Sequence, residues 1–261
     1  MFTRRSRLLP RLCAASLIAY LSFLPASAQP APDCPEASVA PVQVPNLRRA
    51  LTADAGLVVV AVGSSSTQGA MASSRARSYP AVLQAELASA LPRSHVAVLN
   101  RGIGGQDVVE QLARLDADVI AVRPALVVWQ IGANAVLRRM EPEAFKRLVA
   151  AGVRRLHAAG ADVVLVDNQR APAILDTPGH ERIVRALTEA ATETGAGLFS
   201  RDALMARWER DGHPREGFIA PDGLHHNDRG YRCIARALAA AVLEGLDPPG
   251  TAHAASVSAR R

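Results

Sequence analysis

The sequence has few aromatic residues and few cysteines. Of its 261 residues, 4% are aromatic, although 49% are hydrophobic. A surface that stacks nucleic-acid bases needs exposed aromatic side chains among basic ones, so this composition argues against a nucleic-acid partner. The hydrophobic fraction instead suits one sizeable α/β domain in which Ala-rich helices cover buried strands.

The N-terminus has the three regions of a secretory signal peptide. Residues 1–11 contain four arginines and no acid, residues 12–24 contain no charged residue, and Ala26-Ser27-Ala28 has the small-x-small form that signal peptidase cleaves. A membrane-spanning helix needs about 20 apolar residues, which is more than this run supplies. We therefore expect residues 1–28 to be removed and the protein to be periplasmic or secreted, without a permanent membrane span. An uncleaved N-terminal anchor is the alternative.

Removal of this segment changes the charge of the protein. The whole chain has a formal net charge of +6 at pH 7. Four arginines and no acid leave with residues 1–28, so the charge of the remaining chain falls to +2. The basic character therefore belongs partly to the export signal and gives little support for a nucleic-acid partner.

Two of the three cysteines remain after the predicted cleavage, because Cys13 lies in the signal. Cys34 and Cys233 form an even pair in an oxidising compartment, and we predict a disulfide between them. The alternative is that Cys233 is buried as a free, small apolar residue. No CxxC motif or metal-ligand spacing is present.

The rest of the chain divides into an arm, a domain and a tail. Residues 29–50 are rich in Pro and Ala and predict an extended arm, residues 51–246 predict the folded domain, and residues 247–261 predict a disordered tail. Within the domain, short apolar runs indicate buried parallel strands. These runs are Leu57–Val62, Val96–Leu99, Leu126–Ile131, Val163–Val166 and, more weakly, Gly197–Phe199.

Helical periodicity separates these runs. Apolar residues from Phe145 to Leu156 fall on one face of a helix, a second helix is expected from Thr177 to Gly195, and a last one from Asp228 to Glu244. Alternating strands and helices predict a three-layer α/β/α sandwich with a flavodoxin-like parallel sheet of about five strands. In such sheets the active site lies at the carboxyl ends of the strands.

Four segments at those ends carry unusual residues, and each also has a structural interpretation. Residues 63–69 form either a Ser-rich helix cap or a serine placed at the positive end of a helix. Residues 100–105 form either a flexible turn or a Gly-rich loop that lets a backbone N–H approach an oxygen. Asn134 follows the third strand as either a turn residue or a side-chain N–H donor. Residues 221–228 form either a capping loop with solvated histidines or an acid that orients a base.

Two other readings of these segments are weaker. The glycines after the second strand do not have the spacing of a dinucleotide-binding loop, and they do not follow the first strand. A metal site built from Asp222, His225, His226 and Asp228 lacks a further ligand cluster elsewhere in the sequence.

Taken together and in this order, the four segments resemble the SGNH (GDSL-like) hydrolase superfamily. The resemblance spans residues 57–243. It rests on Gly63-Ser64-Ser65, on Asn100, Gly102 and Gly105, on Gly132 and Asn134, and on Asp222 and His225. Two positions depart from the family pattern, since Ser64 and Ala135 stand where the family usually has Asp.

The resemblance implies a serine hydrolase that needs no metal or organic cofactor. Ser65 would be the nucleophile, His225 the general base and Asp222 the acid that orients it. The backbone N–H groups of Ser65 and Gly105 and the side chain of Asn134 would form the oxyanion hole.

The expected activity is carboxylic-ester hydrolysis on a small or polymer-borne acyl ester, such as the O-acetyl groups of a carbohydrate or cell-wall polymer. The alternatives are a lysophospholipase or thioesterase acting on lipid acyl groups, and a non-catalytic glycan-binding domain of the same fold. Long connections near the site, 168–176 and 212–219, suggest that Ile174 and Phe218 line the acyl pocket.

Overall fold

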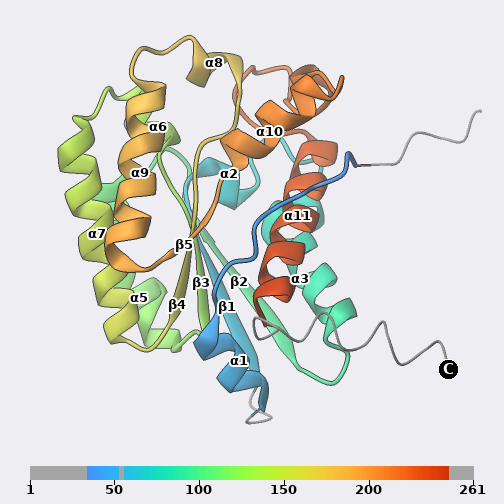
Figure 1. The fold of residues 1–261 in the computed structure, drawn as a ribbon, viewed down its shortest axis with the longest axis vertical. Helices are drawn as coiled ribbons and strands as arrows, with labels where there is room; N and C mark the ends of the chain where they lie inside the picture. Colours follow the sequence, from blue (N-terminus) through green and yellow to red (C-terminus); the bar gives the residue numbers. More distant parts are fainter. Residues whose placement is uncertain (1–33, 53–55, 247–261) are drawn as a thin grey trace, which may run out of the picture. The chain divides into compact units, whose positions relative to one another are not determined.

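A parallel β-sheet lies between two layers of helices in the computed structural model, which describes residues 34–52 and 56–246 (Figure 1). The strand order is β2-β1-β3-β4-β5, and every pair is parallel. This is the flavodoxin-like order, so the predicted three-layer sandwich with five strands is confirmed. The strands are β1 Leu57–Gly63, β2 Val96–Gly102, β3 Leu126–Gln130, β4 Asp162–Val166 and β5 Gly197–Phe199.

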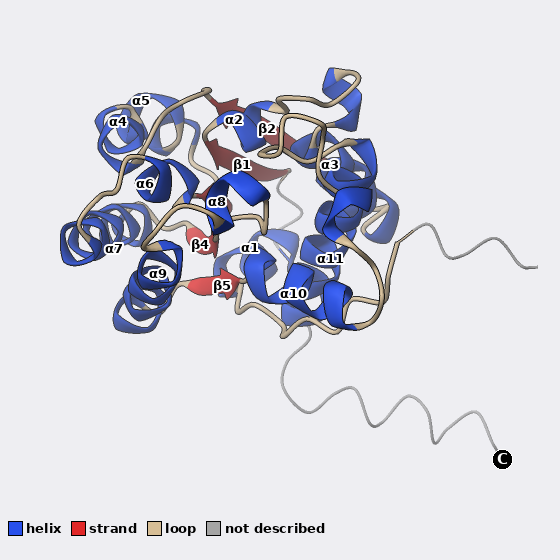
Figure 2. Cartoon of the chain, turned by 90° about the horizontal axis from the view of Figure 1, so that it is seen from above, coloured by secondary structure: helices blue, strands red, loops and turns tan. Residues whose placement is uncertain are grey.

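Helices cover both faces of the sheet (Figure 2). Helices α3 and α11 pack together on one face, and α7 and α9 pack together on the other. The described helices are α1 Pro45–Thr52, α2 Ser65–Gln68, α3 Tyr79–Ala90, α4 Val108–Ala113, α5 Leu115–Asp118, α6 Ala133–Leu137, α7 Pro142–Ala158, α8 Pro172–Leu175, α9 His180–Thr194, α10 Arg201–Arg210 and α11 Asp228–Leu246.

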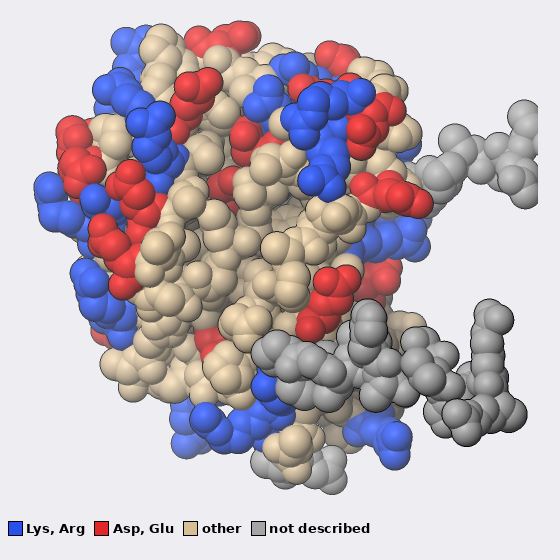
Figure 3. All heavy atoms as spheres, viewed as in Figure 1, with Lys and Arg blue, Asp and Glu red and all other residues tan. Residues whose placement is uncertain are grey.

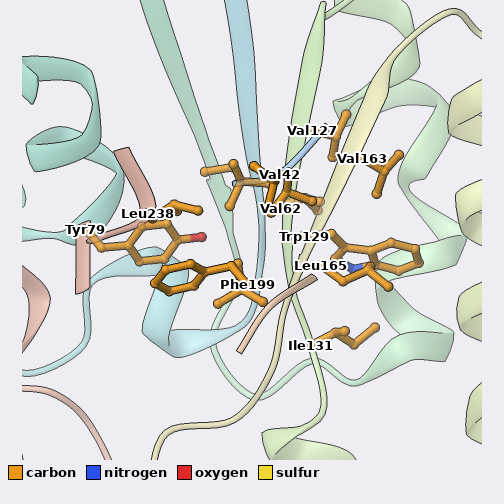
Figure 4. Close-up of a cluster of buried hydrophobic side chains, with 14 of the residues drawn as sticks. Val42, Val62, Tyr79, Val127, Trp129, Ile131, Val163, Leu165, Phe199 and Leu238 are labelled. Atoms are coloured by element: carbon orange, nitrogen blue, oxygen red, sulfur yellow. The ribbon is translucent and has the colours of Figure 1, made fainter. Parts of the chain in front are cut away.

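The central strands are buried on both faces, as their continuous apolar runs predict. Every residue of β3 and β4 is buried. Because side chains alternate along a strand, each of these strands supplies both helical layers. Figure 4 shows Val127, Trp129, Val163 and Leu165 on one side of the sheet and Tyr79, Phe199 and Leu238 on the other.

Most boundaries lie within one or two residues of the predicted ones, and the larger differences are in β2 and α9. Strand β2 continues beyond Leu99 to Gly102, because residues 100–102 keep pairing with residues 61–63 of β1. Helix α9 begins at His180, since Gly179 has a left-handed φ of 97° and precedes the helix as its cap. The predicted end of this helix at Gly195 is confirmed, because Gly195 follows α9 in the left-handed conformation with a φ of 72°.

The N-terminal segment packs against the folded domain more closely than the extended arm predicted from the sequence. Residues 34–44 have no regular structure, but Pro45 begins α1, where its fixed φ suits the first helical position. Val42 and Leu47 are buried in the main core. The Val42 N–H donates to the Ala241 carbonyl at 3.0 Å, and the Leu47 N–H donates to the Asp162 carboxylate at 2.9 Å. The end of the predicted arm is therefore part of the folded domain.

A disulfide joins this arm to the last helix. Cys34 is bonded to Cys233 of α11, with a Cα–Cα distance of 5.3 Å and a sequence separation of 199. Cys233 is buried and Cys34 is partly buried against the core. The bond and the Val42–Ala241 hydrogen bond hold the arm along α11.

The predicted signal peptide, residues 1–28, and the predicted tail, residues 247–261, lie outside the described residues. Among the residues that are described, no helix combines the length and apolar character needed to cross a membrane.

We predict that removing the disulfide destabilises the fold. A cross-link over 199 residues restricts the unfolded chain, so the double variant Cys34→Ser/Cys233→Ser should lose up to about 4–5 kcal/mol of unfolding free energy. Urea denaturation measures this loss. Reductant should lower the stability of the wild-type protein to that of the variant and leave the variant unchanged. Equal midpoints for all four samples would contradict the prediction.

Candidate active site

The four segments singled out in the sequence meet at the carboxyl end of the sheet. Helix α2 follows β1, the loop 103–107 follows β2, α6 follows β3, and the loop 220–227 precedes α11. The order of strands reverses around β1, which lies between β2 and β3. Such a switch point is where open α/β sheets bind ligands.

Ser65, His225 and Asp222 form a continuous hydrogen-bonded chain. The Ser65 Oγ lies 2.7 Å from His225 Nε2, and His225 Nδ1 lies 2.6 Å from an Asp222 carboxylate oxygen. An ionised carboxylate only accepts hydrogen bonds, so Nδ1 carries the ring proton and the Nε2 lone pair faces the serine. The arrangement can remove a proton from Ser65.

Asp222 is held in its ionised form. Its second carboxylate oxygen accepts the backbone N–H groups of Leu224 and His225, each at 3.0 Å. Partial burial raises the pKa of Asp222, but the hydrogen bonds from the His225 ring and from these N–H groups outweigh it and bring the pKa below its ordinary value. The carboxylate can therefore stabilise a protonated His225.

Hydrogen bonds from the segment that follows β4 fix the loop that carries Asp222 and His225. The Gln169 side chain donates to the Leu224 carbonyl at 2.8 Å, and the Ala173 N–H donates to the Gly223 carbonyl at 3.1 Å. Gln169 in turn accepts a bond of 2.9 Å from the buried guanidinium of Arg201.

Arg201 belongs to a buried polar cluster under the loop. Its guanidinium also donates twice to the Asp167 carbonyl, while the Asp167 carboxylate accepts the Ser200 hydroxyl at 2.6 Å and the Asp202 N–H at 2.9 Å. Burial raises the pKa of Asp167 to about 6, against the opposing effect of these hydrogen bonds. Burial also lowers the pKa of Arg201. Buried polar groups cost free energy unless they are paired, so this cluster permits one arrangement of the chain.

A second polar contact fixes the turn that carries Ser65. The side-chain oxygen of Gln130, at the end of β3, accepts the Ser64 N–H at 3.0 Å and the hydroxyls of Ser64 and Thr67 at 3.1 Å each. Asn100 donates to the Thr67 carbonyl at 2.8 Å. At Gly102, a Cβ would lie 2.1 Å from the Gln68 nitrogen, so only glycine lets β2 approach α2 this closely.

The three predicted oxyanion donors have local environments that leave an N–H available. Ser65 is the first residue of α2, so its N–H has no acceptor within that helix. Gly105 has a φ of +80°, and its carbonyl accepts an N–H of Arg138 at 2.8 Å, which fixes the peptide that follows the Gly105 N–H. The Asn134 amide donates one N–H to the Gln106 carbonyl at 2.8 Å and has a second N–H to offer.

Arg138 binds the loop 103–107, which carries Gly105. Its guanidinium pairs with Asp107 at 2.5 Å and with Glu110 at 3.0 Å, and these two acids form the capping box of α4. The Gly104 N–H donates to the Gln68 side chain at 3.0 Å. The loop is therefore held from both α2 and α6.

The two departures from the family pattern have clear structural environments. Ser64 is buried and bonded to Gln130, and Ala135 is 1% exposed within the core. Sequence reasoning missed Gln130, Gln169 and Arg201. Gln130 could have been noticed as a polar residue ending an otherwise apolar strand.

His226 is not equivalent to His225. It is fully buried, and its Nδ1 lies 3.1 Å from the Phe218 carbonyl. Burial, with a smaller effect from the nearby Arg201 charge, lowers the pKa of His226 to about 3. His226 is therefore a neutral structural residue.

The interpretation of Ile174 and Phe218 as walls of the acyl pocket is wrong. Ile174 is 0% exposed and Phe218 is 1% exposed. Phe218 stacks on Trp208, with ring centroids 4.8 Å apart, and the Arg229 guanidinium lies over its other side at 4.6 Å. Length and position of a loop do not reveal which of its side chains turn into the core.

Within residues 34–52 and 56–246, no group of three or more His, Cys, Asp and Glu side chains is arranged to hold a metal ion.

Comparisons with known proteins agree with this architecture. Residues 31–248 match the non-GDSL lipase-like family. Esterase TesA of Pseudomonas aeruginosa is 32% identical over 122 residues, which are 47% of this chain and 60% of that esterase. The matched region thus spans less than two thirds of this curated relative.

Solved structures show the same fold. The crystal structure of TesA superposes with a TM-score of 0.61 at 26% identity, over 73% of this chain and 99% of that one. A two-domain esterase active on acetylated mannans superposes with a TM-score of 0.67 at 21% identity, over 82% of this chain and 57% of that one. The latter likeness is one of fold.

We predict that His225 is essential to turnover and His226 is not. His225→Ala should lower kcat on an ester by about 10³-fold or more, because among the described residues His225 is the base that contacts Ser65 Oγ. His226→Gln should keep most of the activity. Loss of activity only in the His226 variant would reverse the assignment.

The variant His226→Gln also tests how the stability of the fold depends on pH. Because the pKa of His226 falls from 6.5 to about 3 on folding, the unfolded chain binds a proton there that the folded chain does not. The stability that depends on neutral His226 is present above about pH 6.5 and is lost as the pH falls toward about 3. In urea denaturation, His226→Gln should lose less stability than wild type between about pH 7 and about pH 4. Parallel losses would show that His226 does not titrate on unfolding in this way.

Asn134→Ala should fold with an unchanged thermal midpoint and lose about 10²–10³ in kcat, the usual cost of one oxyanion donor. The variant Asn134→Asp keeps the size but places a carboxylate near the developing negative charge, so it should lose at least as much. Steady-state kinetics on a p-nitrophenyl ester measure both. A nearly unchanged kcat in the Ala variant would make Asn134 a turn residue only.

Proposed function

The chain belongs to the non-GDSL lipase-like family, within the SGNH hydrolase superfamily, and from this membership and the geometry of the site we propose that it hydrolyses carboxylic esters through an acyl-enzyme. The observation that carries the proposal is the hydrogen-bonded chain from Ser65 through His225 to Asp222, set at the N-terminus of α2.

The proposed mechanism follows from the positions of the protons. His225 Nε2 accepts the Ser65 proton as Oγ attacks the acyl carbonyl, and Asp222 stabilises the imidazolium. The tetrahedral oxyanion is stabilised by the N–H groups of Ser65, Gly105 and Asn134. His225 then protonates the leaving alcohol, and the ester bond breaks to give the Ser65 acyl-enzyme. A water molecule, deprotonated by His225, then attacks the acyl carbon. The bond to Ser65 Oγ breaks, His225 returns the proton to Oγ, and the carboxylic acid leaves.

The proposed substrate is an O-acetyl group on a carbohydrate or cell-wall polymer outside the cytoplasm. The fold likeness to an esterase active on acetylated mannans supports the substrate class. The Cys34–Cys233 disulfide supports an oxidising compartment, in agreement with the expected signal peptide. The complete hydrogen-bonded series of Ser65, His225 and Asp222 argues against a role in glycan binding alone.

One observation favours a second candidate, hydrolysis of longer acyl esters of lipids. The exposed large hydrophobic side chains of the described chain lie close in sequence to site residues: Met71, Ile103, Val109 and Leu137. Ile103 adjoins Gly104, at which a Cβ would lie 3.8 Å from the Ser65 Cβ. Exposed apolar surface of this kind suits contact with an acyl chain.

Hydrolysis of p-nitrophenyl esters of graded chain length tests the function and separates the candidates. We expect turnover that is greatest for the acetyl ester, and labelling by a fluorophosphonate probe. Ser65→Ala should abolish both, whereas the matched variant Ser66→Ala, which alters the next hydroxyl of α2, should retain part of both.

A maximum at long chains would favour the lipid candidate. No hydrolysis of any ester by the wild-type protein, or labelling that persists in Ser65→Ala, would overturn the proposal.

A further inference from the structure

A polar cleft lies close to α8, outside the catalytic residues. It has a volume of about 600 Å³, within the range of ligand sites, and lies among α8, α9 and α10. Its charged lining residues are Arg170, His180, Glu181, Arg182, Arg185 and Asp202. None of them has a role in the proposed catalytic mechanism.

The charges at the base of the cleft are paired with one another. Asp202 contacts His180 at 3.1 Å and Arg170 at 3.3 Å, and Arg170 also approaches Glu209 at 3.5 Å. His180 is 7% exposed, so this cluster forms a fixed wall. It leaves the charge of Arg170 already compensated.

Arg182 and Arg185 differ from this cluster. They are exposed, and neither forms a salt bridge with a described residue, although Arg182 is close enough to Glu141 for a weaker charge interaction. Because they are three residues apart on α9, their guanidiniums lie on one face of that helix, along the cleft. In Figure 3 basic and acidic side chains are interspersed over the side where α7 and α9 lie in Figure 1, so this side carries no uniform positive field.

The cleft shares its walls with the supports of the catalytic loop. Arg170 follows Gln169, which bonds to the Leu224 carbonyl, and the Asp202 N–H bonds to the same Asp167 that contacts Arg201. In α8, Ala173 bonds to Gly223, and Thr177, four residues later, lines the cleft. The cleft is therefore built on the same segments that support the catalytic loop, along which an ester-bearing oligomer would extend.

We propose that this cleft binds a carboxylate group of an acidic polysaccharide, so that the polymer carrying the ester is a polyuronate or a similar carboxylated glycan. The inference rests on the proposed ester hydrolysis and names its substrate class. Arg182 and Arg185 bind the sugar carboxylate, for which the planar guanidinium is well suited. Asp202, Glu181 and Thr177 are placed to accept or donate hydrogen bonds to sugar hydroxyls.

The lining favours a carboxylated glycan over a phospholipid headgroup. Two carboxylates, Glu181 and Asp202, share the cleft with the arginines. They repel a divalent phosphate, such as inorganic phosphate or a phosphate monoester, more than a carboxylate monoanion, and they give the hydroxyl-rich ring of a sugar the acceptors that it needs. Leu175, Pro178 and Val184 are the apolar contributors, which is a small apolar area for a lipid.

The experiment compares acetate release from O-acetylated oligogalacturonate, from O-acetylated xylo-oligosaccharide, which is neutral, and from p-nitrophenyl acetate. Wild type should prefer the acidic oligomer, and salt should weaken that preference. In Arg182→Ala/Arg185→Ala, kcat/KM for the acidic oligomer relative to the neutral one should fall by about five- to thirtyfold, mainly through KM. Arg154→Ala, which removes an exposed arginine from α7 outside the cleft, is the matched control and should behave as wild type.

A binding measurement keeps this test independent of the proposed function. Calorimetry of the Ser65→Ala protein with unacetylated oligogalacturonate should show binding that weakens in the triple variant Ser65→Ala/Arg182→Ala/Arg185→Ala. Absence of hydrolysis of every ester, with such binding retained, would overturn ester hydrolysis and leave the acid-glycan site standing.

Three other outcomes would overturn the proposal that the cleft binds a glycan carboxylate. These are an unchanged preference in the arginine variant, equal losses on the neutral oligomer, or no binding of oligogalacturonate. Binding of inorganic phosphate or of phosphatidylglycerol vesicles in preference to the oligouronate would assign the cleft to a phosphate group instead.

Discussion

The side-chain oxygen of Gln130 is the contact on which the site depends most directly. It lies at the end of the central strand β3 and accepts three hydrogen bonds from the turn that carries Ser65. A buried amide oxygen with this many donors cannot be lost without leaving polar groups unpaired in the core. The sheet thereby sets the position of the nucleophile, and the strand order brings β2 and its glycine loop to the other side of the same turn.

Asp222 and His225 are also positioned by a buried side-chain amide, that of Gln169 after β4. Gln169 and Arg201 connect the end of β4 with the carbonyl of Leu224, between Asp222 and His225. Both supports place uncharged amide groups in contact with the catalytic segments, and the buried Arg201 acts on the loop through Gln169.

Much of the fold could be predicted from the sequence, because buried parallel strands are continuous apolar runs and the catalytic segments follow them in order. The supports could not, because Ser64 and Gln130 are 66 residues apart and Gln169 and Leu224 are 55 apart. Such pairs follow from the three-dimensional arrangement alone. Ile174 and Phe218 were misassigned for the related reason that a loop can turn apolar side chains inward.

The contact of the arm with α11 has a consequence for the order in which the protein assembles. Residues 34–44 come first in the domain, yet their partners, Cys233 and Ala241, belong to the last helix. A chain made or threaded from its N-terminus must therefore leave this arm undocked until nearly the whole sequence has emerged. Closure of the arm requires α11, so a truncated chain that lacks this helix would present its arm, with a free thiol, to proteases and to quality control.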